Sequence, residues 1–332
     1  NSERKIARLP GPPYQFLDGI TAVTGEPFVM KAGATCEAQY EVPRDAWYFR
    51  ENRGEFMPFS VLLEVALQPC GWLAAYCGSA LTSATDLRFR NLGGKATQFK
   101  PVTPEIGTLT TNVKMSSVSS SAGMIIQHYD MCVRAGREKV YEGTTYFGFF
   151  SADALAQQVG IREAKVPWPS GADVAHAERG ELPRDTPFPA PMMRMIDRID
   201  AYIPDGGTNK LGLAVGRIAV DPAFWFFQAH FYQDPVWPGS LGLESFLQLL
   251  KFVAWKRWGN PPAAGWQTVA LNRLHAWTYR GQVIPADREV TVLLEITAVD
   301  DANHRLTANG FLTVDGRVIY QMTDFTQIGR AH

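Results

Sequence analysis

An internal repeat constrains the fold of this 332-residue chain more than any other feature. Residues Met57–Glu64 align with Trp237–Glu244, an offset of 180 (57 against 237), and Gln68 then falls on Gln248. Further matches keep nearly the same offset: Asp18-Gly19-Ile20 with Asp197-Arg198-Ile199, Val102-Thr103-Pro104 with Val283-Ile284-Pro285, and Val140-Tyr141 with Ile319-Tyr320. Matches spread over both halves indicate a duplicated domain, so we expect two similar folding units.

Each half contains the same predicted elements in the same order. A long apolar helix opens at Pro58 and at Pro238, because proline suits the first helical position. Strands follow each helix, and we predict them at 108–115, 124–134, 140–150, 267–280, 289–298, 305–314 and 318–327. Asp315-Gly316 is a hairpin-turn signal between the last two strands. A helix that is apolar nearly all round is typical of one wrapped by a curved sheet, so we predict α+β domains.

A proline-rich segment separates the halves. Hydrophobic periodicity fades between residues 151 and 191, and prolines gather there. We therefore predict an N-terminal domain at 1–150, a linker at 151–191 and a C-terminal domain at 192–332. Because the chain begins with Asn1 rather than methionine, we also expect it to be a segment of a longer protein.

Composition narrows the classes of ligand. Lys and Arg total 32 against 33 for Asp and Glu, and this balance provides no field that would gather nucleic acid or an anionic membrane. The apolar stretch 57–81 carries Glu64, Gln68 and Pro69, so we predict a buried helix rather than a membrane span. Four cysteines without a CxxC pair indicate reduced thiols and a cytoplasmic protein. The histidines are scattered and no nucleotide-binding glycine pattern occurs, so we expect no metal and no cofactor.

One segment, Ala229–Glu244, carries the functional signal. It contains His230, the turn Asp234-Pro235-Val236, Pro238-Gly239 at the start of the long helix, and Glu244. In this order the motif resembles the active site of the FabA-like, or β-hydroxydecanoyl thioester dehydratase, family. The tandem arrangement resembles a dehydratase region of a polyunsaturated fatty acid or polyketide synthase.

This resemblance implies both a fold and a reaction. The fold is a double hot-dog, with two hot-dog folds in tandem and each a long central helix wrapped by a curved antiparallel sheet. The reaction is dehydration of 3-hydroxyacyl thioesters on acyl carrier protein to trans-2-enoyl thioesters. The partners would be that carrier and the other domains of a multidomain synthase. A homodimer stays open, because the two fused halves already form the family's dimeric unit.

The residue types fit this chemistry independently of the resemblance. Elimination of water needs a base for the C2 proton and an acid for the leaving hydroxide. His230 can act as the base near neutral pH. A glutamate inside an apolar helix has a raised pKa and can stay protonated as the acid. Glu64 and Gln68 lie four residues apart on one helix face, so the amide can orient the carboxyl.

The resemblance also implies how the residues combine. In the family a histidine from one unit faces the acid on the helix of the other, which pairs His230 with Glu64 and leaves Glu244 as the alternative acid. We expect substrate contacts from Gly239, whose helix-start N–H groups can bind the thioester oxygen, and from Val236, Gln68 and Phe231.

The first half is expected to lack a working counterpart of this site. Arg50 lies eight residues before Pro58, where counting places the counterpart of His230, and arginine cannot act as a base. Phe59 stands where the second half has Gly239.

Three functions stay open at the level of the sequence. The first is the dehydratase, whose Asp-Pro-Val and Leu-Gly-Leu signature is nearer to a branch that also isomerises the trans-2 double bond to cis-3. The second is a hot-dog thioesterase, which would release free acid. The third is a non-catalytic protein that only docks the acyl carrier.

Overall fold

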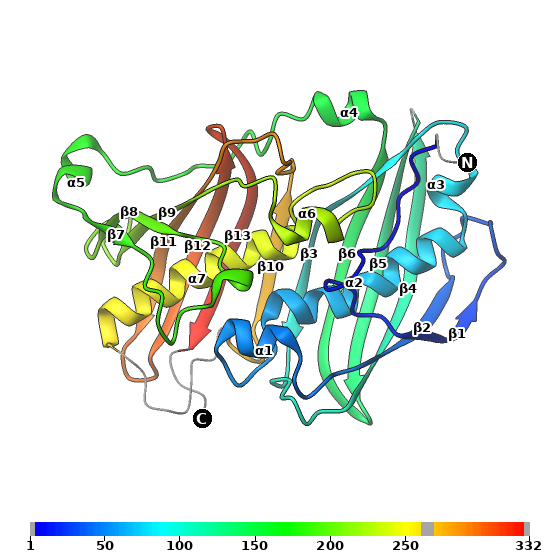
Figure 1. The fold of residues 1–332 in the computed structure, drawn as a ribbon, viewed down its shortest axis with the longest axis horizontal. Coiled ribbons are helices and arrows are strands. Elements are labelled where there is room, and N and C mark those ends of the chain that lie inside the picture. The colour runs from blue at the N-terminus through cyan, green and yellow to red at the C-terminus, as the bar shows by residue number, and fades with distance from the viewer. Residues whose placement is uncertain (1–3, 122, 260–268, 329–332) are drawn as a thin grey trace.

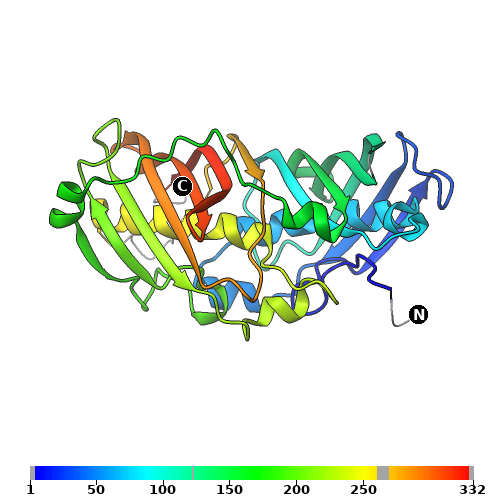
Figure 2. The same ribbon diagram turned by 90° about the horizontal axis from the view of Figure 1, so that it is seen from above.

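The computed structural model describes residues 4–121, 123–259 and 269–328. Residues 1–3 and 329–332 of the predicted domains, and 267–268 of a predicted strand, lie outside the described residues. The chain forms one long curved sheet, with two long helices lying end to end against one of its faces (Figures 1 and 2). All strand pairs are antiparallel among the described residues.

The two halves have the same element order apart from α3, which is described in the first half only. The first half contains β1 (Gly19–Thr24), β2 (Thr35–Glu41), α1 (Trp47–Asn52), α2 (Phe59–Tyr76), α3 (Ser79–Thr82), β3 (Arg88–Gln98), β4 (Thr108–Ser121), β5 (Met124–Ala135) and β6 (Glu138–Phe150). The second contains β8 (Arg198–Ile203), β9 (Leu213–Ala219), α6 (Trp225–Ala229), α7 (Gly239–Trp258), β10 (Leu274–Tyr279), β11 (Glu289–Asp300), β12 (Arg305–Val314) and β13 (Arg317–Ile328). Between them lie α4 (Ala152–Ala156), α5 (Gly171–His176), β7 (Glu178–Glu181) and the 3₁₀ helix η1 (Pro191–Met193).

The strand order shows the duplication directly. From one edge to the other it is β1-β2-β4-β5-β6-β3-β10-β13-β12-β11-β9-β8-β7, so the second half repeats the first in reverse from the centre. The halves join where β3 pairs with β10, from Leu274 opposite Thr97 to Thr278 opposite Gly93. The extra edge strand β7 comes from the segment predicted as linker. The domain boundaries at 1–150, 151–191 and 192–332 stay a prediction.

The long helices are the core of each half. Both α2 and α7 are buried along most of their length, and their N-terminal ends meet at the centre of the molecule (Figure 1). By length and composition alone Phe59–Thr82 could span a membrane, but 72% of its most apolar window is buried inside the structure. Packing of apolar side chains between helix and sheet is the main favourable contribution to such a fold. The predicted α+β double hot-dog fold is therefore confirmed.

Local details follow from residue chemistry. Pro58 and Pro238 lie one position before the helices, as N-cap residues, rather than at the first helical position as predicted. Asp315 and Gly316 both have positive φ, 49° and 78°, as the predicted tight hairpin turn requires. The short helices α1 and α6 were not predicted, because their five or six aromatic-rich residues are too few to show a helical period.

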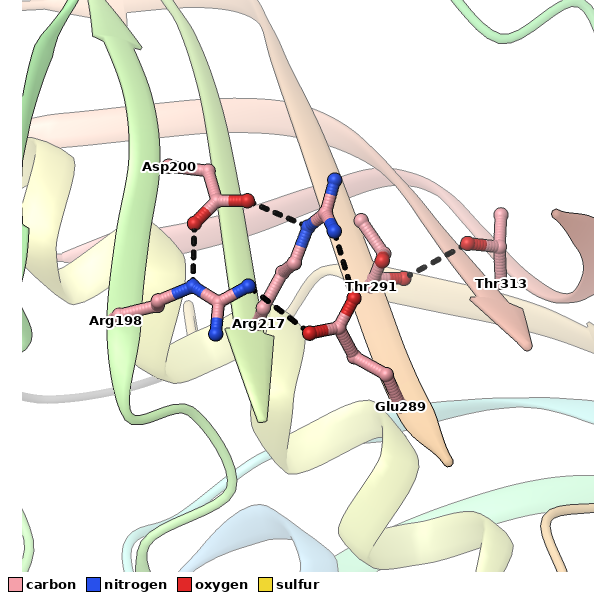
Figure 3. Close-up of polar contacts among 6 residues, drawn as sticks. All are labelled: Arg198, Asp200, Arg217, Glu289, Thr291 and Thr313. Carbon is pink, nitrogen blue, oxygen red and sulfur yellow. Dashed lines mark hydrogen bonds and ion pairs between the residues drawn. The ribbon is translucent and has the colours of Figure 1, made fainter. Parts of the chain in front are cut away.

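A ring of ion pairs braces three strands of the second half. Arg198 and Arg217 alternate with Asp200 and Glu289 on β8, β9 and β11 (Figure 3). The four N–O distances run from 2.5 to 2.9 Å. These side chains are partly exposed, so the ring contributes modestly to stability and mainly fixes strand register.

Candidate active site

A cavity of about 130 Å³ lies where the two halves meet, beside the N-terminal end of α7 and along α2 from Glu64 to Ala75. Its wall includes all six residues predicted for the site: His230, Glu64, Gly239, Val236, Gln68 and Phe231. Glu64 and Gln68 come from the first half and the other four from the second. Glu244, the alternative acid, is not part of this wall. The arrangement places a histidine and a carboxyl from different halves around one space.

His230 follows α6 directly and is held by its own loop. Its Nδ1 lies 3.0 Å from the carbonyl oxygen of Val236, and the Val236 N–H donates to the His230 carbonyl oxygen at 2.9 Å. A carbonyl oxygen can only accept, so Nδ1 carries the proton and Nε2 is the basic nitrogen. Burial lowers the pKa of His230 from 6.5 to about 4, and the positive charge of Arg90 adds to this effect. The imidazole is therefore neutral and able to accept a proton at neutral pH.

The loop after His230 is anchored by the other half. Arg90 of β3 forms a two-pronged contact with Asp234, with N–O distances of 2.6 and 3.0 Å. Arg88 lies 3.7 Å from the same carboxylate. Phe231 packs against the imidazole, with ring centroids 3.6 Å apart. A bidentate arginine–carboxylate pair is rigid, so β3 helps to fix the position of the histidine.

Glu64 is buried, and both of its oxygens accept hydrogen bonds. Oε1 accepts from the Ser240 hydroxyl at 2.6 Å, and Oε2 accepts from the Gln68 amide at 3.1 Å. Burial raises the pKa of Glu64, and the hydrogen bonds from Ser240 and Gln68 oppose that shift. The contact from Gln68 is the one that the four-residue spacing predicted. A carboxyl whose pKa is raised by burial and a neutral imidazole thus share the cavity.

Gly239 is the first residue of α7 and faces Tyr279. A β-carbon at this position would lie 3.0 Å from a ring atom of Tyr279, so a side chain here would crowd the cavity. The first N–H groups of a helix have no partner within the helix and can bind a developing negative charge. Within the described chain, the buried Tyr279 hydroxyl has no hydrogen-bond partner.

Glu244 has the same local partners as Glu64 but a different environment. It accepts from the Ser60 hydroxyl at 2.8 Å, as Glu64 accepts from Ser240. One turn from Gln248, the helix carries Lys251 at the position that Gly71 occupies in α2. Lys251 is buried, and its Nζ donates to the Pro187 carbonyl oxygen at 3.1 Å. Its long side chain and Trp255 stand where Gly71 and Ala75 line the cavity in the other half.

The counterpart of His230 in the first half is Asn52 rather than Arg50. Trp47 and Trp225 both begin a short helix, and their indole N–H groups donate to Pro13 and Met192, at 3.1 and 2.9 Å. Counting forward from these tryptophans places Asn52 opposite His230. Counting back from Pro58 fails, because the loop before the long helix is two residues shorter in the first half.

Neither candidate counterpart can act as a base. Arg50 points outward, with 72% of its side chain exposed. Asn52 is buried, and a neutral amide does not accept a proton near neutral pH. Among the described residues no three His, Cys, Asp or Glu side chains gather closely enough to hold a metal ion.

Comparison with known proteins identifies relatives over most of the chain. The family model described as a FabA-like domain matches residues 9–144 and 188–323, one match in each half. A polyunsaturated fatty acid synthase polypeptide of Thraustochytrium sp. (strain ATCC 26185 / S-3) is 30% identical over 322 residues. That match covers 87% of this chain and 21% of the relative, so the chain spans about a fifth of that protein.

Solved structures share the fold at low sequence identity. A putative oleoyl thioesterase from Lactobacillus plantarum superposes with a TM-score of 0.53 at 10% identity, covering 90% of this chain and 98% of that one. The structure described as GphF Dehydratase 1 gives a TM-score of 0.51 at 14% identity, covering 90% and 94%. At these identities the likeness concerns the fold alone.

Proposed function

The chain belongs to the family of FabA-like domains, and we propose that its composite cavity eliminates water from 3-hydroxyacyl thioesters. The single observation that carries this proposal is that a histidine and a glutamate, whose pKa values burial shifts in opposite directions, lie on one wall. His230 is neutral because burial lowers its pKa to about 4, and burial raises the pKa of Glu64. A base and an acid held in the same space are what the elimination requires.

The proposed step uses both groups at once. Nε2 of His230 takes a proton from C2, and the electrons of that C–H bond form the C2–C3 double bond. The C3–O bond breaks, and the proton of Glu64 joins the leaving hydroxide to give water. The N–H of Gly239 would donate to the thioester oxygen as negative charge develops there. The products are an enoyl thioester and one water molecule, with the proton of C2 on His230.

The substrate class follows from the relatives rather than from the cavity. Family membership and the similarity to a polyunsaturated fatty acid synthase polypeptide support a dehydratase-type role in polyunsaturated fatty acid or polyketide synthesis. We propose that the acyl chain arrives on acyl carrier protein, and that the chain acts beside other domains of a multidomain synthase in the cytoplasm.

Mass spectrometry of a 3-hydroxyacyl thioester incubated with the protein tests the proposal. We expect the thioester to lose the mass of one water molecule while the thioester bond stays intact. Release of free acid and thiol would instead identify a thioesterase. Binding of the acyl carrier without any turnover would identify a docking protein. Fragmentation of the product also locates the double bond and so reveals any isomerisation from trans-2 to cis-3.

The pH dependence of kcat/KM should be bell-shaped with an acidic limb near pH 4. Protonated His230 cannot accept a proton, so activity is lost as the pH falls through its lowered pKa of about 4. Ionised Glu64 cannot donate, so activity is lost as the pH rises through a pKa that lies above the ordinary 4.5. Initial rates across the pH range measure both limbs. An acidic limb at the ordinary histidine value of 6.5 would contradict a base that is buried and neutral.

A larger side chain at Gly71 should limit the length of acyl chain that the cavity accepts. Gly71 and Ala75 lie one turn apart on the cavity wall beyond Gln68, and a β-carbon on Gly71 would lie 3.0 Å from Leu9. We expect Gly71→Leu to lower kcat/KM at least about tenfold for long-chain thioesters, because the side chain occupies space that the acyl tail needs. The same variant assayed with a short-chain thioester is the control. An equal loss for short-chain and long-chain thioesters would show that the substitution disturbs the catalytic groups rather than the depth of the cavity.

A further inference from the structure

Two serine hydroxyls each donate a hydrogen bond to the glutamate on the opposite helix. Each is the second residue of its helix: Ser240 donates to Glu64 at 2.6 Å, and Ser60 donates to Glu244 at 2.8 Å. The two contacts are related by the internal duplication. By themselves they would be a structural link between the ends of α2 and α7.

On the cavity side only, a tyrosine joins the contact. The Tyr14 hydroxyl lies 2.8 Å from the Ser240 hydroxyl oxygen, so Tyr14 can donate to Ser240 whenever Ser240 donates to Glu64. The Tyr14 carbonyl oxygen accepts from the Gln68 amide at 2.9 Å. Tyr14 therefore contacts both Ser240 and Gln68, the two residues that form hydrogen bonds with the Glu64 oxygens.

The equivalent site around Glu244 cannot form these tyrosine contacts. At an offset of 179, Met193 occupies the place of Tyr14, and its carbonyl oxygen accepts from Gln248 at 2.7 Å as the Tyr14 carbonyl accepts from Gln68. Methionine has no hydroxyl, so Ser60 has no equivalent donor behind it. Among the described residues, the tyrosine–serine link therefore occurs at Glu64, which lines the cavity, and not at Glu244, which does not.

We propose that Ser240 and Tyr14 are positioning residues that aim the Glu64 carboxyl at the substrate. This inference rests on the proposed dehydration and names how its acid is held. A serine hydroxyl can accept from a protonated carboxyl and donate to an ionised one, so the contact persists before and after proton transfer. Gln68 holds the second oxygen as a donor, through its amide N–H at 3.1 Å.

Neighbouring groups do not compete for this role. The titratable groups beside Glu64 are Tyr14 from the N-terminal segment and Tyr279 from β10. His230, Arg8 and Arg90 line the same cavity, and His230 is neutral throughout the alkaline limb because its pKa is lowered to about 4. Burial raises the pKa of both tyrosines well above 10, so both stay neutral while Glu64 titrates. A change in the alkaline limb of activity therefore reports on Glu64 and its hydrogen bonds.

Three variants test the proposal, with Ser60→Ala as the matched control. Ser240→Ala removes a donor to the ionised carboxyl, so we expect kcat to fall about tenfold and the alkaline limb to move to higher pH, with KM changed little. Tyr14→Phe should cause a smaller change in the same direction. Ser60→Ala removes the same contact from Glu244 and should lower thermal stability similarly while leaving kcat and the pH profile at wild-type values.

The outcomes distinguish the positioning role of Ser240 from the proposed dehydratase activity. Wild-type kcat and an unmoved alkaline limb in Ser240→Ala, or the same change in Ser60→Ala, would overturn the positioning role while the dehydratase activity stands. Should Ser240→Ala fail to fold, an unaltered pH profile in Tyr14→Phe would overturn it equally. A wild-type protein that removes no water would overturn the proposed function itself, and the role of Ser240 with it.

Discussion

Replacing His230 by alanine should lower the rate of water elimination by about 10²- to 10⁴-fold, because the cavity then has no group able to take the C2 proton. Glu64 on the same wall is the proposed acid, and the guanidinium groups of Arg8 and Arg90 cannot act as bases. Tyr279 and Tyr320 are neutral because burial raises their pKa. Single-turnover rates with a 3-hydroxyacyl thioester measure the loss. The variant should still bind substrate, since the apolar wall is unchanged.

His275 provides a matched control for this substitution. It is also buried, burial likewise lowers its pKa to about 4, and its Nε2 accepts from the Thr326 N–H at 3.3 Å. It lies in β10 at the join between the halves but not on the cavity wall. We expect His275→Gln to change stability and to leave the rate of elimination near the wild-type value. Equal losses in the two variants would mean that any buried histidine matters to the fold and that His230 has no special role.

Replacing Glu64 by glutamine should cause a loss of the same order, about 10²- to 10⁴-fold. Glutamine has nearly the same shape and can still accept from Ser240, so the fold and the cavity should be retained. It has no acidic proton for the leaving hydroxide, so the C3–O bond would break without assistance. Rates measured on folded protein, checked by an unchanged melting temperature, report this effect. More than a tenth of wild-type activity in this variant would show that Glu64 is not the acid.

The duplication explains why the fold was predictable from the sequence. The repeat predicted two equivalent units, and the apolar character of α2 and α7 predicted helices enclosed by a sheet. Strand ends at Thr108, Arg305 and Val314 coincide with the predicted ones, because hydrophobic alternation starts and stops there. The edge strand β7 was not predicted, because its four residues Glu178–Glu181 are exposed and carry no apolar pattern.

The site was only partly predictable, because its supporting contacts are remote in sequence. The motif supplied His230 and Gly239, and the resemblance supplied the pairing with Glu64, which the structure brings to the same cavity. Arg90 lies 144 residues from Asp234, and Tyr14 lies 226 residues from Ser240, so no local spacing signals either contact. The serine lies within the motif, but nothing in the sequence marks it as a hydrogen-bond donor to the acid.

Four residues explain why we expect no second active site at Glu244. Asn52 provides no base, and Phe59 occupies the helix start where Gly239 leaves room. Lys251 and Trp255 stand where small residues line the cavity in the other half. Glu244 is left buried among its neighbours, and the negative charge it would carry lies near Lys251. Glu244 is thus buried and lies off the wall of the described cavity, as expected of a glutamate with a structural role.

The measurement that tests the central claim most directly is kcat/KM for Glu64→Gln and Glu244→Gln, determined side by side on one 3-hydroxyacyl thioester. The two substitutions remove a carboxyl from equivalent helix positions. They differ in the site that each helix faces and in Lys251, which lies near Glu244. We predict a loss of about 10²-fold or more for Glu64→Gln and near wild-type activity for Glu244→Gln. The reverse result, or equal losses in both variants, would contradict a single active site shared between His230 and Glu64.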